Sequence, residues 1–125
     1  MRYSVSIDVP SLELGVSFYG RAFGFTELAR PVEGYAVLGR DELRLGMLEK
    51  PAGSSPAPGT DDLRTYERHW TPVHIDFHVD DFEDTLQQAL DAGAICEQKF
   101  EGGAHPPVAF CCDPFGNGFC IIGYP

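Results

Sequence analysis

The sequence predicts an α+β fold built from two β-α-β-β-β repeats, and three observations support this. Val9-Pro-Ser-Leu-Glu13 and Val79-Asp-Asp-Phe-Glu83 lie 70 residues apart and align, with apolar residues matching on both sides. Each segment follows an alternation of apolar and polar residues, which is typical of a strand, and precedes a helical pattern. Each helical pattern ends at a glycine, which is a common helix stop. Self-similarity at a fixed offset indicates a duplicated structural unit.

The two repeats are expected to form a single domain of 125 residues, which is long enough for a hydrophobic core. The first repeat is predicted to span residues 1–49 and the second 72–125. The segment 50–71 between them begins with a stretch rich in proline, glycine and serine, so it is interpreted as a linker.

The first repeat opens with an alternating segment from Tyr3 to Val9, which predicts a strand. Ser11 is a suitable N-cap for a helix, and Gly24 is suited to end it. Apolar residues between them recur at helical spacing. Three short strands are expected to follow, over 25–28, 34–38 and 43–48.

The second repeat follows the same order. The segment from Val73 to Val79 alternates like a strand, Asp81 is a candidate N-cap, and Gly93 is a candidate helix stop. Strands are expected over 95–100, 108–112 and 119–122. The sequence Asp113-Pro-Phe-Gly116 has the residue types of a β-turn.

Composition excludes several classes of protein. The net charge of −10 leaves no basic footprint for nucleic acid. No apolar run reaches the roughly 20 residues of a transmembrane helix, so no membrane association is expected. The start of the chain lacks the apolar segment of a signal peptide, which predicts a cytoplasmic protein. Disulfides are therefore not expected among the cysteines.

A candidate site follows from the polar faces of the two opening strands. The helices should cover the apolar faces from outside, so the curved mixed sheet should turn its polar faces into a shared cleft. The alternative is a polar face that meets solvent, but matched imidazoles and carboxylates favour the cleft. Tyr35 and Phe110 are candidate aromatic walls for a planar or cationic ligand. The predicted polar ligand-binding residues are Ser4, Ser6, Asp8, His74, Asp76, His78 and Cys120.

Two segments carry a family resemblance. Residues 18–25, Phe-Tyr-Gly-Arg-Ala-Phe-Gly-Phe, close the first helix, and residues 108–117, Val-Ala-Phe-Cys-Cys-Asp-Pro-Phe-Gly-Asn, precede the last strand. With the duplicated unit, these segments resemble the vicinal oxygen chelate superfamily, which includes glyoxalase I, bleomycin-resistance proteins, fosfomycin-resistance enzymes and extradiol dioxygenases. The resemblance covers essentially the whole chain.

The resemblance implies metal ligands on the first and last strand of each repeat. The corresponding residues here are Ser4, Gly46, His74 and Cys120, of which only His74 is a usual match. A catalytic divalent ion needs about three protein ligands, so no metal cofactor is expected. If a divalent metal does bind, a displaced pair is predicted, either Asp8 with His78 or, as the preferred pair, His74 with Cys120, which would favour Zn²⁺.

Individual side chains leave alternatives open. His74 could be a general base, a ligand anchor or an ordinary hydrogen-bonded strand histidine. Cys120 could be a thiolate beside His74, but a buried apolar cysteine is the favoured interpretation. Asp8 and Asp76 could pair across the cleft as acid and base, although ordinary hydrogen bonding is favoured.

The leading functional prediction is a bleomycin-resistance-like protein that binds a small molecule without a catalytic metal. The alternative is a metal-dependent lyase, isomerase or dioxygenase-like enzyme with rearranged ligands around His74. A third is a partner module that has lost ligand binding. Whether the protein is an enzyme stays open, and a homodimer is expected because relatives often form one and sheet edges favour association.

Overall fold

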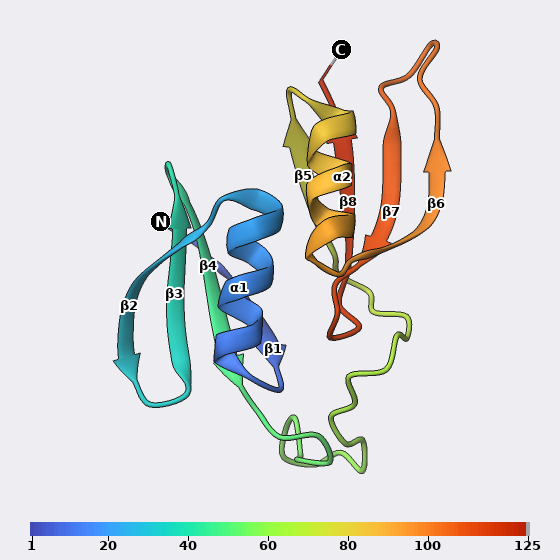
Figure 1. Cartoon of the computed structure of the whole chain (residues 1–125). Coiled ribbons are helices and arrows are strands. Elements are labelled where there is room, and N and C mark those ends of the chain that lie inside the picture. Colours follow the sequence, from blue (N-terminus) through green and yellow to red (C-terminus); the bar gives the residue numbers. More distant parts are fainter. Residues whose placement is uncertain (125) are drawn as a thin grey trace. The chain divides into compact units, whose positions relative to one another are not determined.

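The structure is a computed structural model and describes residues 1–124. Within that range, two four-stranded sheets and two helices form the predicted β-α-β-β-β order twice, so the α+β repeat fold is confirmed (Figure 1). The strand orders are β1-β4-β3-β2 and β5-β8-β7-β6. The elements are β1 (Val5–Val9), α1 (Leu12–Phe23), β2 (Thr26–Val32), β3 (Tyr35–Arg40), β4 (Leu43–Glu49), β5 (Ile75–Val79), α2 (Phe82–Ala92), β6 (Ile95–Phe100), β7 (Val108–Cys112) and β8 (Gly118–Gly123).

The chain divides into two compact units. The first comprises residues 1–20 and 24–67, and the second comprises 21–23 with the described chain from 68 onward. Part of the predicted linker is thus packed within the first unit, where Arg64 Nε donates to Asp8 Oδ2 at 2.8 Å and the Tyr66 hydroxyl donates to the Lys50 carbonyl at 2.5 Å. In the described residues, no helix is long and apolar enough to cross a membrane.

The duplication extends to the strand register. The opening strand of each sheet runs parallel to the closing strand, as β1 with β4 and β5 with β8, and the remaining pairs are antiparallel. In β2 the register shifts between Glu27 and Ala29 and again between Ala29 and Val32, whereas β6 has one shift, between Cys96 and Gln98. Both repeats therefore carry an irregularity at the same place in the third element.

The predicted helix ends are confirmed. The Ser11 side chain accepts from Leu14 N at 3.3 Å, and Asp81 accepts from Asp84 N at 3.1 Å. Gly24 and Gly93 end the helices with φ of +72° and +117°, the left-handed region where a side chain is unfavourable.

Each helix covers one face of a sheet and so defines the opposite face. A Cβ added to Gly123 of β8 would lie 3.3 Å from Phe82 of α2, so Phe119, Ile121 and Gly123 face the helix. In the first unit, a Cβ on Gly15 of α1 would lie 2.4 Å from Met47 Sδ, so Met47 faces α1. We call the face of the second sheet opposite α2 the open face.

Two strands begin later than predicted. β1 starts at Val5 rather than Tyr3, and β5 starts at Ile75 rather than Val73. Tyr3 and Val73 are 91% and 73% exposed, so their apolar side chains gain little burial that would hold them in a ladder.

Candidate functional site

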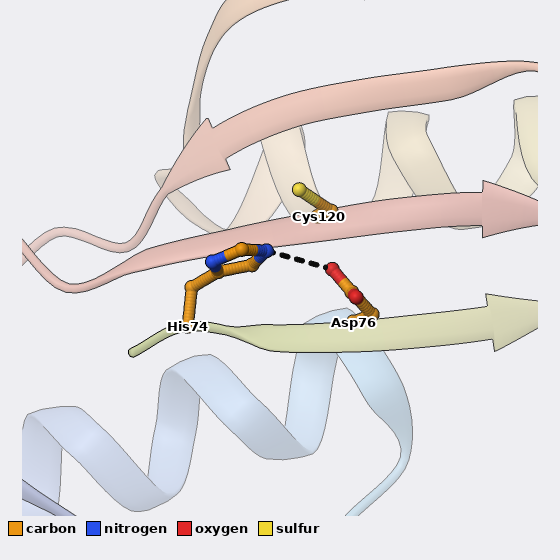
Figure 2. Close-up of side chains that lie close together, drawn as sticks. All are labelled: His74, Asp76 and Cys120. Atoms are coloured by element: carbon orange, nitrogen blue, oxygen red, sulfur yellow. Dashed lines mark ion pairs between the residues drawn. The ribbon is translucent and has the colours of Figure 1, made fainter. Parts of the chain in front are cut away.

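Asp76 and Cys120 are neighbours on the open face of the second sheet. β5 and β8 run parallel, and their register pairs these two residues directly. His74 lies one residue before β5 and two before Asp76, so it belongs to the same face. Figure 2 shows the imidazole and the carboxylate turned toward one another, with Cys120 on the adjacent strand.

The three side chains form a compact cluster. His74 Nε2 lies 3.0 Å from Asp76 Oδ1, and one donor atom from each of His74, Asp76 and Cys120 lies within 4.8 Å of the others. The His74 and Asp76 side chains are 49% and 43% exposed, whereas Cys120 is buried. A ligand can therefore reach the imidazole and the carboxylate from solvent, while the thiol lies beneath them.

The surroundings of Cys120 keep its thiol protonated. Burial, with smaller contributions from the charge of Asp76 and a hydrogen bond to its carboxylate, raises the pKa of this thiol from 9.0 to about 11. A nucleophilic cysteine needs a lowered pKa. The surroundings thus favour a buried thiol that donates to Asp76 over an activated thiolate.

An aromatic side chain continues the row from Asp76 and Cys120. Phe110 of β7 pairs in register with Cys120, and Gln98 of β6 pairs with Phe110. Phe110 is 39% exposed, and its ring lies 5.7 Å from that of Phe100. The row Asp76, Cys120, Phe110, Gln98 therefore joins a polar cluster to an apolar surface.

A salt bridge between Arg68 and Glu97 lies over Gly118, two residues before Cys120 on β8. Arg68 donates to both carboxylate oxygens of Glu97 at 3.0 and 3.2 Å. A Cβ on Gly118 would lie 2.9 Å from Arg68 Nη2, so the guanidinium rests on β8 where glycine leaves room. The sequence analysis missed this feature, because the partners are 29 residues apart and no local pattern connects them.

His78 stands apart from the cluster. It lies one full strand period beyond Asp76, pairs in register with Ile122, and has its ring 5.8 Å from that of Tyr124. It is exposed, but it is not among the three residues whose donor atoms converge.

The candidate residues of the first unit do not gather into a comparable group. Ser4 is exposed and precedes β1, and Ser6 pairs in register with Gly46. Asp8 is bound by Arg64. Tyr35 is half-buried, and its ring lies 3.2 Å from where a Cβ on Gly46 would stand. The predicted opposition of these residues to His74, Asp76 and His78 stays a prediction.

The family resemblance raises the question of whether the cluster on the open face can hold a metal ion, and its donor atoms give the answer. Imidazole nitrogen, carboxylate oxygen and thiol sulfur together suit a borderline ion such as Zn²⁺. The predicted pair, His74 with Cys120, is thus joined by Asp76, which the sequence analysis had not placed in a metal set. Binding would require Cys120 to lose its proton and the His74–Asp76 contact to rearrange.

A hollow of about 610 Å³ lies in the first unit and holds none of the predicted site residues. Leu12 N at its edge donates to Glu49 Oε2 at 3.1 Å, and Arg30 is paired with Glu27. The Glu49 carboxylate and the Arg30 guanidinium thus already have partners within the protein. The lining residues are Ser11, Leu12, Glu13, Val16, Ser17, Arg30 and Glu49.

Comparisons with known proteins agree with this architecture. The profile of a family described as "Glyoxalase-like domain" matches residues 4–122. No curated protein matches the chain. Similar solved structures include a glyoxalase-related enzyme from Fulvimarina pelagi, with 15% identity over 99% of this chain and 88% of that one and a TM-score of 0.72.

Two further structures are of named activities. A mutant of the fosfomycin resistance protein FosX from Listeria monocytogenes, in complex with Mn(II) and 1S,2S-dihydroxypropylphosphonic acid, has 13% identity over 95% of this chain and 86% of that one, with a TM-score of 0.72. A lactoylglutathione lyase from Agrobacterium tumefaciens has 12% identity over 98% and 92%, with a TM-score of 0.65. At such identities the likeness shows the fold.

Proposed function

Because the chain belongs to the glyoxalase-like domain family of the vicinal oxygen chelate superfamily, we propose that it binds a small organic molecule on the open face of the second sheet, without a catalytic metal. The observation that carries the proposal is the half-exposed His74–Asp76 pair, 3.0 Å apart. This pair offers hydrogen bonds to a ligand. Phe110, which pairs in register with Cys120 on the next strand, offers an apolar wall.

The chemistry of the face favours a planar, cationic ligand. The Asp76 carboxylate can accept from a positively charged group, and the exposed Phe110 ring can stack on an aromatic one. A chain with a net charge of −10 attracts cations over a longer range. These features suit a basic heteroaromatic compound, such as the bleomycin type of antibiotic.

Two observations support binding without a metal. Two of the three donor groups already satisfy each other, and the third holds its proton to a pKa of about 11. In the first sheet, the residues that take the places of Asp76 and Cys120 are Ser6 and Gly46, which supply no carboxylate, imidazole or thiol.

Calorimetric titration of the chelator-treated protein with metal-free bleomycin, and with smaller aromatic cations, tests the proposal. We expect saturable binding that weakens about tenfold or more in His74→Ala and Asp76→Asn, because each variant removes one partner of a charged hydrogen bond. His105→Ala is the matched control, since His105 is exposed on the loop between β6 and β7 and should leave the affinity unchanged.

A second candidate is favoured by the convergence of His74, Asp76 and Cys120 within 4.8 Å. It is a metal-dependent lyase, isomerase or dioxygenase-like enzyme whose ion is held by these three residues. Such an ion would supply Lewis-acid polarisation of a substrate oxygen. The chain's own groups would hold the ion and, at His74, accept a proton once that nitrogen is free.

Metal analysis of the purified protein separates the two candidates. Stoichiometric Zn, Ni, Mn or Fe that is lost in both His74→Ala and Cys120→Ala, together with turnover of glutathione adducts or catechols on metal addition, would establish the second and reject the first. Tight ligand binding by metal-free protein, with no turnover under any of these metals, would do the reverse. If neither ligand nor metal binds, both are rejected.

A further inference from the structure

Two cysteines face each other on the side of the second sheet opposite the open face. Cys96 of β6 and Cys111 of β7 are direct partners in the antiparallel register. The Cys96 thiol donates to the Gln98 carbonyl at 3.6 Å, and besides burial it also contributes to the raised pKa of the Cys111 thiol. Both are free thiols, Cys111 is 1% exposed, and Cys96 is half-buried and so reachable from solvent.

This placement meets the geometric requirement for a disulfide. Directly opposed residues of antiparallel strands have Cα atoms about 4.5–5.5 Å apart. A disulfide spans Cα separations of roughly 4.4–6.8 Å, with both Cβ atoms on the same side. Opposed residues satisfy the second condition because side chains in register share a face. The bond could therefore form with little movement of the backbone.

We propose that Cys96 and Cys111 form an oxidisable dithiol that a hydroperoxide converts to a reversible cross-strand disulfide between β6 and β7. The inference is independent of any ligand on the open face. It also revises the expectation that none of the cysteines would pair, which rested on the predicted cytoplasmic location.

The reaction proceeds in two balanced steps. The Cys96 thiolate attacks one peroxide oxygen, the O–O bond breaks, and the departing alkoxide takes up a proton as an alcohol, which leaves a sulfenic acid on Cys96. The Cys111 sulfur then attacks the Cys96 sulfur, the S–O bond breaks, and hydroxide leaves with the Cys111 proton as water. The sum is two thiols and one hydroperoxide giving one disulfide, one alcohol and one water.

The surroundings of the two thiols determine which one reacts first with the peroxide. Burial, reinforced by the neighbouring Cys96, raises the pKa of the Cys111 thiol to about 12. Cys111 is thus a poor first nucleophile and is shielded from the oxidant, so it acts as the resolving thiol. Cys96, at the accessible edge of the pair, is the site of first attack.

The other cysteines lack such a partner and provide matched controls. Cys112 pairs in register with Ile95 and Gly118, and Cys120 pairs with Asp76 and Phe110. Both point to the open face, since each neighbours a residue that faces the helix.

The test treats the intact folded protein with a small excess of hydrogen peroxide, counts free thiols and maps any disulfide by mass spectrometry without reduction. Wild type should fall from four free thiols to two, with one intramolecular Cys96–Cys111 link that dithiothreitol reverses. Cys112→Ala should form the same link at an unchanged rate. Cys96→Ala, a change at a half-buried position, should form none.

Three results would overturn the proposal. They are retention of all four thiols, a link that involves Cys112, Cys120 or a second chain, and over-oxidation of Cys96 with Cys111 still reduced. Cys111→Ala adds a check if it folds, because sulfenic acid should then accumulate on Cys96.

Discussion

The two sheets share a framework and differ in what they display on the face away from the helix. Both have the same strand order, the same parallel pairing of first and last strand, and a register shift in the third element. The row Asp76, Cys120, Phe110 and Gln98 of the second sheet corresponds in register to Ser6, Gly46, Val37 and Ala29 of the first.

This difference separates the residues that make the fold from those that make the site. Caps, stopping glycines and helix-facing apolar residues occur in both repeats because each β-α-β-β-β unit needs them to form. The opposite face carries no such requirement, so one copy can hold imidazole, carboxylate and thiol while the other holds serine and glycine. Chemistry is therefore expected to depend on the second unit, and variants can test this asymmetry.

The largest expected effect comes from the turns between the last two strands of each repeat. Asp113 is 2% exposed and accepts from Phe115 N at 2.8 Å, Asn117 N at 2.9 Å and Asn117 Nδ2 at 3.0 Å. Asp113→Ala leaves these donors without their acceptor, so urea unfolding should show a loss of about 3 kcal/mol. Asp113→Asn, which keeps one acceptor oxygen, should lose less.

The corresponding turn of the first repeat provides the control. Asp41 has a φ of +50° and a side chain that is 88% exposed. Asp41→Asn should change stability by less than about 0.5 kcal/mol, because asparagine tolerates this backbone region and no buried donor is lost. Equal losses at Asp113 and Asp41 would contradict the view that the two turns are held differently.

Much of the fold could be predicted because its signals are local. Strand alternation, the N-caps Ser11 and Asp81, and the stops Gly24 and Gly93 depend on residues close in sequence, and all were confirmed. The true starts of β1 and β5 were not predicted, since alternation continues to Tyr3 and Val73 although neither is buried. The register shifts depend on pairing between strands, which one strand's sequence does not record.

The three clustered residues of the candidate site could be named from the sequence, but their grouping could not. His74, Asp76 and Cys120 are all predicted ligand-binding residues, yet the predicted metal pair of His74 with Cys120 leaves out Asp76. Side chains can lean along a strand, and here the His74 and Asp76 donor atoms approach to 3.0 Å. The Arg68–Glu97 pair was beyond prediction because it depends on where a loop crosses the sheet.

The next largest effect is expected from a substitution at Gly46. This residue lies in the row of the first sheet that carries no imidazole, carboxylate or thiol. A Cβ there would lie 2.4 Å from Ser6 Oγ and 3.2 Å from Tyr35 Cε2. Gly46→Ala should cost about 2 kcal/mol in urea unfolding, because the strand position is overpacked. Ser6→Ala removes the closest atom, so the double variant should recover part of that loss, and additive losses would show that Ser6 is not the obstacle.

The smallest effect is a pH dependence that should arise in the second repeat, which holds every cysteine of the chain. The pKa of Cys120 is raised from 9.0 to about 11 in the folded protein, by burial and by the neighbouring Asp76. Between these values the folded state keeps a proton that the unfolded state has lost. The stability from this thiol is thus complete below about pH 9 and is lost as pH rises through 11.

Urea unfolding of wild type and Cys120→Ala at pH 8 and pH 10 measures this contribution. Wild type should lose about 1 kcal/mol more than the variant over this interval, since one pKa unit corresponds to about 1.4 kcal/mol and the thiol is only partly titrated at each end. Cys111, whose pKa is raised to about 12, contributes in the same direction in both proteins and cancels in the comparison. Equal losses of stability in wild type and Cys120→Ala would contradict this. They would mean that the Cys120 thiol has the same pKa in the folded and unfolded states.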